Sequence, residues 1–236
     1  NLSRMNRLVA LFVTALCVNA FAVDRMWDIR YTFGPDTRPS PRWGIGVGAV
    51  SNYGSDILFP ANITMALSRE WNIGGKVNIQ SIDKFDQVIV SLDVGGRYLI
   101  NANNFVELDG NFGLNRNNST AVVLTYGNEQ FISKNFANFY ELRAGALQGV
   151  TGEDGYVKFA AGMTPTLYFT TFFRTYIEIN MSGSIGNLTD DFMIDIIPKL
   201  ELSLGPARVR LDFDIGIMQK KNNDVQTIAL YVISAL

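Results

Sequence analysis

The sequence predicts an all-β protein, a transmembrane antiparallel up-and-down β-barrel of about 12 strands, and three observations support this fold class. Apolar and polar residues alternate with a period of two along most of the chain after Trp43. Several alternating runs are about twice as long as strands of soluble sheets, which usually have roughly 5 to 6 residues. A segment with the pattern of a secretory signal precedes the first run.

Residues 1–22 form the predicted signal peptide. Arg4 and Arg7 give a basic start, residues 8–18 form an apolar run, and Ala20-Phe21-Ala22 has the small-x-small pattern of a cleavage site. The apolar run is shorter than the roughly 20 residues that a membrane-spanning helix needs. Cys17, the only cysteine, lies inside this run, so we expect the mature chain to contain no thiol and no disulfide.

Residues 23–42 combine arginines, aromatic residues and three prolines, and they show no alternation. We expect this segment to be a periplasmic lead into the barrel, and the alternative is a plug that folds into the barrel mouth. Residues 43–236 are the predicted barrel domain, without an internal domain boundary.

The run from Trp71 to Ile82 shows the alternation most clearly. One face of an extended chain carries apolar side chains, at Trp71, Ile73, Val77 and Ile79. The other face is polar, at Asn72, Lys76, Asn78 and Gln80. The same pattern predicts strands at residues 43–50, 62–68, 71–82, 87–98, 106–115, 121–126, 140–146, 157–163, 173–181, 192–204, 207–218 and 225–236.

Short polar segments between these runs predict the turns, at Arg69-Glu70, Asp83-Lys84, 101–104, 115–119, Gly205-Pro206 and 220–224. An even number of strands places both ends of the barrel domain on the same side of the membrane, which we expect to be the periplasmic side. Ten strands remain an alternative, because residues 121–126 and 166–171 are ambiguous and the two faces of 121–126 are not assigned.

The composition is compatible with a barrel. The chain is 47% hydrophobic and 18% charged, close to the values of soluble proteins, because a barrel exposes only every second residue to lipid. Without the two arginines of the signal, 18 basic residues stand against 22 acidic ones, and no basic patch indicates a nucleic-acid partner. After the signal, no apolar stretch is long enough for a membrane helix, so a membrane-embedded chain must form a closed barrel.

A soluble, secreted β-sandwich that binds a ligand or partner is the alternative fold, since its strands also alternate. Two further features favour the barrel. The polar face carries both signs of charge within one strand, at Arg208, Arg210, Asp212 and Asp214, as a wet interior requires. Aromatic residues also gather near the predicted strand ends, where membrane interfaces enrich them, for example at Trp43, Trp71, Tyr98 and Phe173.

Charged residues on the polar faces of the strands are the candidate functional residues, because in a barrel they line the lumen. They are Lys76, Asp93, Arg97, Glu107, Asp109, Glu141, Arg143, Lys158, Arg174, Glu178, Lys199, Glu201, Arg208, Arg210, Asp212 and Asp214.

Enzymatic chemistry is not predicted. The chain contains no histidine, which removes Ser-His-Asp nucleophile activation and histidine metal sites. Gly44 to Ala49 matches the letters of the dinucleotide fingerprint, but a helix does not follow it. Glu107 and Asp109 fall on one face and could act as an acid/base pair or bind a cation, but solvated lumen carboxylates near basic residues are the preferred interpretation. We expect no catalytic residue, cofactor or metal.

At the level of class, the chain resembles the small outer-membrane β-barrel proteins of Gram-negative-type bacteria. The resemblance rests on the signal that ends at Ala22, the hairpin rhythm from Trp43 onward and the closing strand Ile228–Leu236. It implies insertion into the outer-membrane lipid bilayer with help from the barrel assembly machinery. The expected function is a narrow passive channel for small polar solutes, and the alternative is a non-conducting structural or surface-interaction barrel.

Overall fold

The computed structural model describes residues 43–52, 57–82, 87–114, 120–148, 156–185, 192–205, 207–219 and 226–235. The signal and lead predicted for residues 1–42 lie outside these residues, as does Leu236. The described residues form the strands β1 (Trp43–Asn52), β2 (Ile57–Ala66), β3 (Trp71–Ile82), β4 (Gln87–Asn101), β5 (Asn104–Gly113), β6 (Thr120–Ser133), β7 (Phe136–Gln148), β8 (Tyr156–Tyr168), β9 (Phe173–Ser184), β10 (Met193–Leu204), β11 (Ala207–Gln219) and β12 (Gln226–Ala235). They contain no helix that is long and apolar enough to cross a membrane.

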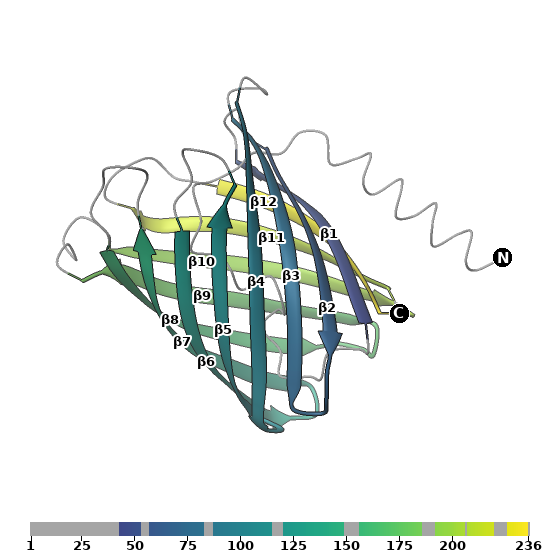
Figure 1. The fold of residues 1–236 in the computed structure, drawn as a ribbon. Helices are drawn as coiled ribbons and strands as arrows, with labels where there is room; N and C mark the ends of the chain where they lie inside the picture. Colours follow the sequence, from purple (N-terminus) through teal and green to yellow (C-terminus); the bar gives the residue numbers. More distant parts are fainter. Residues whose placement is uncertain are drawn as a thin grey trace.

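The strands form one closed, antiparallel, up-and-down barrel (Figure 1). Each strand pairs with its neighbours in sequence, and β1 pairs with β12 from Gly44↔Ala235 to Asn52↔Thr227. The predicted fold class is therefore confirmed, and the described residues form 12 strands and not ten. The sandwich alternative is wrong, because a sandwich needs two sheets packed face to face and this barrel is a single sheet closed on itself.

The end of the barrel that contains the start of β1 and the end of β12 carries short turns. Residues 67–70, 102–103, 134–135 and 169–172 are the turns that join β2 to β3, β4 to β5, β6 to β7 and β8 to β9 there. In the first turn, the Ser68 hydroxyl accepts hydrogen bonds from the backbone N–H groups of Glu70 and Trp71, both at 3.1 Å. Gly205, between β10 and β11, has a φ of 66°, which glycine adopts without strain. The turns predicted at residues 83–84, 115–119 and 220–224 lie outside the described residues.

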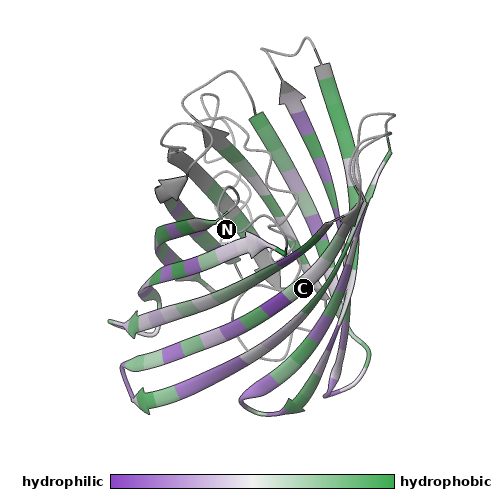
Figure 2. Ribbon diagram, turned by 90° about the vertical axis from the view of Figure 1, so that its left-hand side faces the viewer, coloured by the Kyte–Doolittle hydropathy of each residue, from purple (hydrophilic) through white to green (hydrophobic). Residues whose placement is uncertain are grey.

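The outer surface of the barrel is apolar and the inner surface is polar. Along β3, Trp71 is 50% and Val77 39% exposed, whereas Asn72 is 1% and Lys76 5% exposed. Figure 2 shows the resulting alternation of hydrophobic and hydrophilic positions along the strands. This arrangement is the inverse of a soluble protein, which buries large apolar side chains and exposes charged ones.

The hairpins of β6 to β8 are longer than the alternation predicts. β6 was expected to end at Tyr126, but its pairing with β7 continues from Tyr126↔Leu142 to Phe131↔Ala137. Asn128 interrupts the apolar outer face of this extension, and its side-chain amide donates a 2.7 Å hydrogen bond to the Asn104 side chain of β5. The structure also assigns the faces of β6, with Val122 and Leu124 exposed and Ala121 and Val123 buried.

Three prolines lie inside strands, at Pro60 of β2, Pro165 of β8 and Pro198 of β10. Each coincides with an interruption of the pairing on one side of its strand, to β1, β9 and β11 respectively. Pairing on the other side continues through the proline, to β3, β7 and β9. Because proline lacks the backbone N–H, a one-sided interruption allows it to remain within a sheet.

Closure predicts a specific crosslink. Val47→Cys and Val232→Cys lie opposite each other on β1 and β12, so oxidation should join them readily. The measurement is the shift of the oxidised double variant on a denaturing gel without reductant, in a Cys17→Ser background.

The control pair is Val47→Cys with Ile228→Cys, which lies four residues further along β12, about 13 Å away. Equal crosslinking of both pairs, or failure at Val232 while the hairpin pair Ile45→Cys and Ile63→Cys succeeds, would show that β1 and β12 are not paired in this register.

Candidate functional site: the polar interior of the barrel

The strands turn most of the charged candidate residues into the interior, where they are buried. Less than a tenth of the surface is exposed at Lys76, Asp93, Arg97, Glu107, Asp109, Glu141, Arg143, Arg174, Glu178, Lys199, Glu201, Arg210 and Asp212. Lys158 is half-buried, and the Arg208 side chain is 31% exposed. Asp214 belongs to β11, but its side chain lies outside the described part of the structure.

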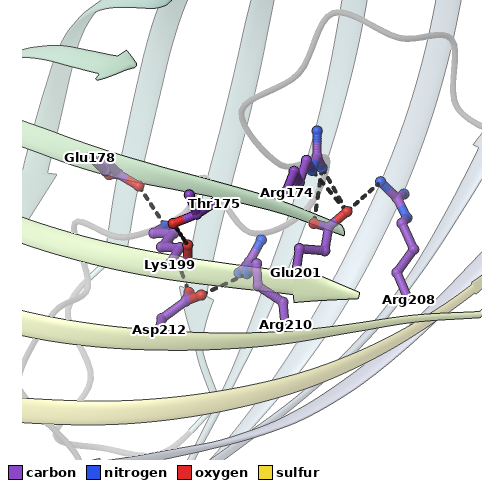
Figure 3. A network of polar contacts seen from close by, with 8 residues as sticks. All are labelled: Arg174, Thr175, Glu178, Lys199, Glu201, Arg208, Arg210 and Asp212. Atoms are coloured by element: carbon purple, nitrogen blue, oxygen red, sulfur yellow. Dashed lines mark hydrogen bonds and ion pairs between the residues drawn. The ribbon is translucent and has the colours of Figure 1, made fainter. Parts of the chain in front are cut away.

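Lys199 is the centre of one charge network on the wall formed by β9, β10 and β11 (Figure 3). Its Nζ lies 2.5 Å from Glu178 Oε2 and 3.6 Å from Asp212 Oδ2. Arg210 approaches the same aspartate, with Nε 2.9 Å from Asp212 Oδ1, although the angle does not make this ion pair a hydrogen bond. Two carboxylates therefore enclose Lys199, which is itself 1% exposed.

Glu201 is the centre of a second network on the same wall, closer to the turns (Figure 3). The Nε and Nη2 groups of Arg174 donate hydrogen bonds to its two carboxylate oxygens, each at 2.9 Å. This fork geometry is the strongest form of an arginine–carboxylate pair. Arg208 approaches Glu201 from β11, with Nη1 3.8 Å from Oε1.

The wall of β3, β4 and β5 carries a third group of contacts. Lys76 Nζ lies 2.7 Å from Asp93 Oδ2, which also accepts a 2.8 Å hydrogen bond from the Asn78 side chain. Arg97 donates from Nε to Glu107 Oε2 at 2.6 Å, and its Nη2 contacts the same oxygen. These pairs lie along the wall, between neighbouring strands.

An aromatic cluster also faces the interior, and the sequence analysis did not identify it. Phe105 and Phe139 are 1% and 4% exposed, and their rings stack with centroids 5.9 Å apart. The guanidinium of Arg97 lies 3.8 Å from the Phe105 ring centroid. A Cβ on Gly127 would come within 2.4 Å of the Phe105 ring, so this glycine makes room for it.

The signal for this cluster was present in the sequence. Phe105 and Phe139 each lie two residues before a predicted inward glutamate, Glu107 and Glu141, so the strand period places them on the same face. Tyr176 stands in the same relation to Glu178, and it is 2% exposed.

The interior offers charge and hydrogen-bonding groups. Among the described residues, no three His, Cys, Asp or Glu side chains are grouped closely enough to hold a metal ion. A small pocket lies between β6 and β9, lined by Glu129, Phe139, Thr164, Thr166, Tyr168, Arg174 and Tyr176.

No protein-family model and no curated protein matches this chain. Solved structures do match it. The KdgM porin in complex with disordered oligogalacturonate has a TM-score of 0.63 at 8% identity, over 82% of this chain and 99% of that chain. The NanC porin has a TM-score of 0.60 at 10% identity, over 81% and 99%. An outer-membrane channel from Pseudomonas putida F1 has a TM-score of 0.57 at 11% identity, over 86% and 98%.

The chain has the fold of an outer-membrane β-barrel protein. The predicted resemblance to this class is thereby confirmed for the fold. At identities of 8% to 11%, the likeness concerns the architecture and not a shared solute.

Replacement of Lys199 should destabilise the barrel strongly. Lys199→Met removes the cation in contact with Glu178 and Asp212 and leaves buried carboxylates behind, so we expect a loss of about 3 to 5 kcal/mol in the free energy of unfolding. Urea titration of the barrel in lipid vesicles, followed by tryptophan fluorescence, measures this loss.

Arg208→Met is the matched control. Its side chain is 31% exposed and lies 3.8 Å from Glu201, so the expected loss is about 0 to 1 kcal/mol. Similar losses for the two variants would contradict the assignment of Lys199 to a buried network.

Proposed function

We propose that this chain is a bacterial outer-membrane β-barrel that forms a narrow passage for small polar solutes. The observation that carries the proposal is the polar inner face of a closed barrel whose outer face is apolar. Lipid requires such an outer face, and polar solutes require such an inner one. The similarity to porins and to an outer-membrane channel supports the same function.

The width of the passage follows from the strand number and from side-chain burial. Eight-stranded barrels are filled by their own side chains, barrels of 16 strands hold an aqueous channel, and 12 lies between them. Interior groups such as Lys199 and Glu178 are each 1% exposed, so little free space surrounds them. The passage is therefore restricted to small solutes.

The proposed location is the outer membrane, with export through the predicted signal at residues 1–22. The proposed partners are the lipid bilayer and the barrel assembly machinery. The proposal assigns no enzymatic step to the interior, because the chain lacks histidine. The lumen-lining role of the charged candidate residues is part of the proposal, and their burial on the inner wall supports it.

A non-conducting structural barrel is the second candidate function. The observation in its favour is the same burial of the interior charges, since an open aqueous channel exposes the groups that line it. Conductance therefore separates the two candidates.

Recording from planar bilayers tests the passage. The wild-type barrel should give small, discrete conductance steps, and Phe105→Ala should enlarge them because it removes a ring from the interior. Phe112→Ala is the control, since Phe112 of the same strand is 43% exposed on the outer face, and its steps should match those of the wild type. Verified insertion without conductance in all three proteins would favour the structural barrel.

The membrane location predicts an unusual response to arginine on the outer face. Leu142 lies in the middle of β7 and is 61% exposed. In a soluble protein an exposed leucine tolerates arginine, but at the centre of a bilayer Leu142→Arg should cost about 2 to 4 kcal/mol. The measurement is the free energy of unfolding in lipid vesicles.

Leu67→Arg provides the comparison. Leu67 is 57% exposed, but it lies in the turn between β2 and β3, where the cost near the interface should be about 0 to 1 kcal/mol. The same small cost at both positions would argue against a bilayer around β7.

A further inference from the structure

Asp109 differs from the other interior carboxylates of β4 and β5. Asp93 contacts Lys76 and Glu107 contacts Arg97, but the described residues contain no ion pair with Asp109. Asp109 is 2% exposed, and its Oδ1 has no hydrogen-bond partner. The inward-facing charges of β3 to β5 therefore include one carboxylate that no neighbouring cation contacts.

The register explains why no cation is in contact with Asp109. On β4 it faces Gly95, which has no side chain, and on β6 it faces Val123, which is apolar and 1% exposed. The carboxyl group of Glu107, two residues earlier on β5, is a hydrogen-bond neighbour of Asp109 and repels its negative charge. Lys76 and Arg97 attract Asp109 less strongly, and each is in contact with another carboxylate. Neither flanking strand thus places a cation directly opposite Asp109.

Asn111 provides a second unused acceptor beside Asp109. It lies two residues further along β5, on the same face, and is 3% exposed. Its Nδ2 donates a hydrogen bond to Asp93, while its Oδ1 has no partner. The bond to Asp93 restricts rotation of the Asn111 side-chain amide, so its unpartnered oxygen keeps a fixed orientation.

A buried carboxylate without a counter-charge is unfavourable, and a buried amide oxygen without a donor adds to the penalty. A small cation removes both penalties at once, because hard oxygen ligands from a carboxylate and an amide are those that such ions prefer. We propose that Asp109 and Asn111 form a binding site for a monovalent inorganic cation, sodium or potassium, on the inner wall of the barrel.

This inference deepens the proposed function and rests on it for the route by which the ion enters. An occupied and exchanging site at Asp109 makes the passage prefer cations over anions. Binding itself, however, raises the stability of the folded barrel whether or not the barrel conducts, because an ion that binds only the folded state favours it.

The test uses the full-length barrel in detergent micelles and measures its thermal unfolding midpoint by circular dichroism. Sodium or potassium chloride replaces N-methyl-glucamine chloride at constant ionic strength, so that a small inorganic cation replaces a large organic one while the chloride concentration stays the same. The wild-type midpoint should rise and saturate with sodium or potassium. Asp109→Asn should lose this rise, and Asn111→Leu should shift its half-maximum to higher salt.

Asp212→Asn is the matched control on the opposite wall. Asp212 is equally buried, at 3% exposure, but it is paired with Lys199 and Arg210, so this variant should keep the wild-type response. An unchanged response in Asp109→Asn overturns the inference. So does a wild-type midpoint that ignores the cation and depends on pH through Asp109, because a proton then neutralises the carboxylate.

Reversal potentials across planar bilayers separate this inference from the proposed function. If the wild-type barrel prefers cations and Asp109→Asn weakens this preference, both the cation site and the passage are supported. A midpoint that responds to the cation in a barrel that inserts but never conducts supports the site and contradicts the passage. Conductance with the same cation preference in wild type and Asp109→Asn, together with an unchanged midpoint response, contradicts the site and leaves the passage intact.

Discussion

Closure of a single hydrogen-bonded sheet is the constraint on which the rest of this structure depends. A strand edge inside a bilayer would leave a row of N–H and C=O groups without partners, and lipid offers none. Pairing of β1 with β12 removes the only two edges that the order of strands would leave. Because side chains alternate along each strand, closure also divides every strand between an outer and an inner surface.

The registers between strands then determine which interior charges meet. Lys76 lies directly opposite Asp93, and Arg97 directly opposite Glu107. On the other wall, Glu201 faces Arg174 and Lys199 faces Asp212. Opposite charges placed as direct cross-strand partners stabilise a sheet, so the same registers that close the barrel also neutralise its interior. Asp109 faces Gly95 and Val123 instead, so no cation stands directly opposite it.

The comparison with porins shows how little of the sequence this architecture requires. A TM-score of 0.63 accompanies 8% identity, so the fold depends on the pattern of apolar and polar positions and not on particular side chains. Transport properties depend on the identity of the inward-facing side chains, which such a likeness does not carry over. Any solute preference of this barrel has to be argued from its own interior residues, including Phe105, Phe139 and the charge networks.

The sequence by itself determined the fold class, narrowed the number of strands to 12 or ten and indicated the direction in which most charged residues point. These properties depend on a period of two, which neighbouring residues reveal, as Leu211 and Asp212 do by falling on opposite faces. Only the tertiary structure decided that β6 extends to Ser133, that Phe105 stacks on Phe139, and that Lys199 contacts both Glu178 and Asp212. Those contacts depend on the register between strands. Turn geometry and barrel closure set this register, and no local pattern of residues encodes it.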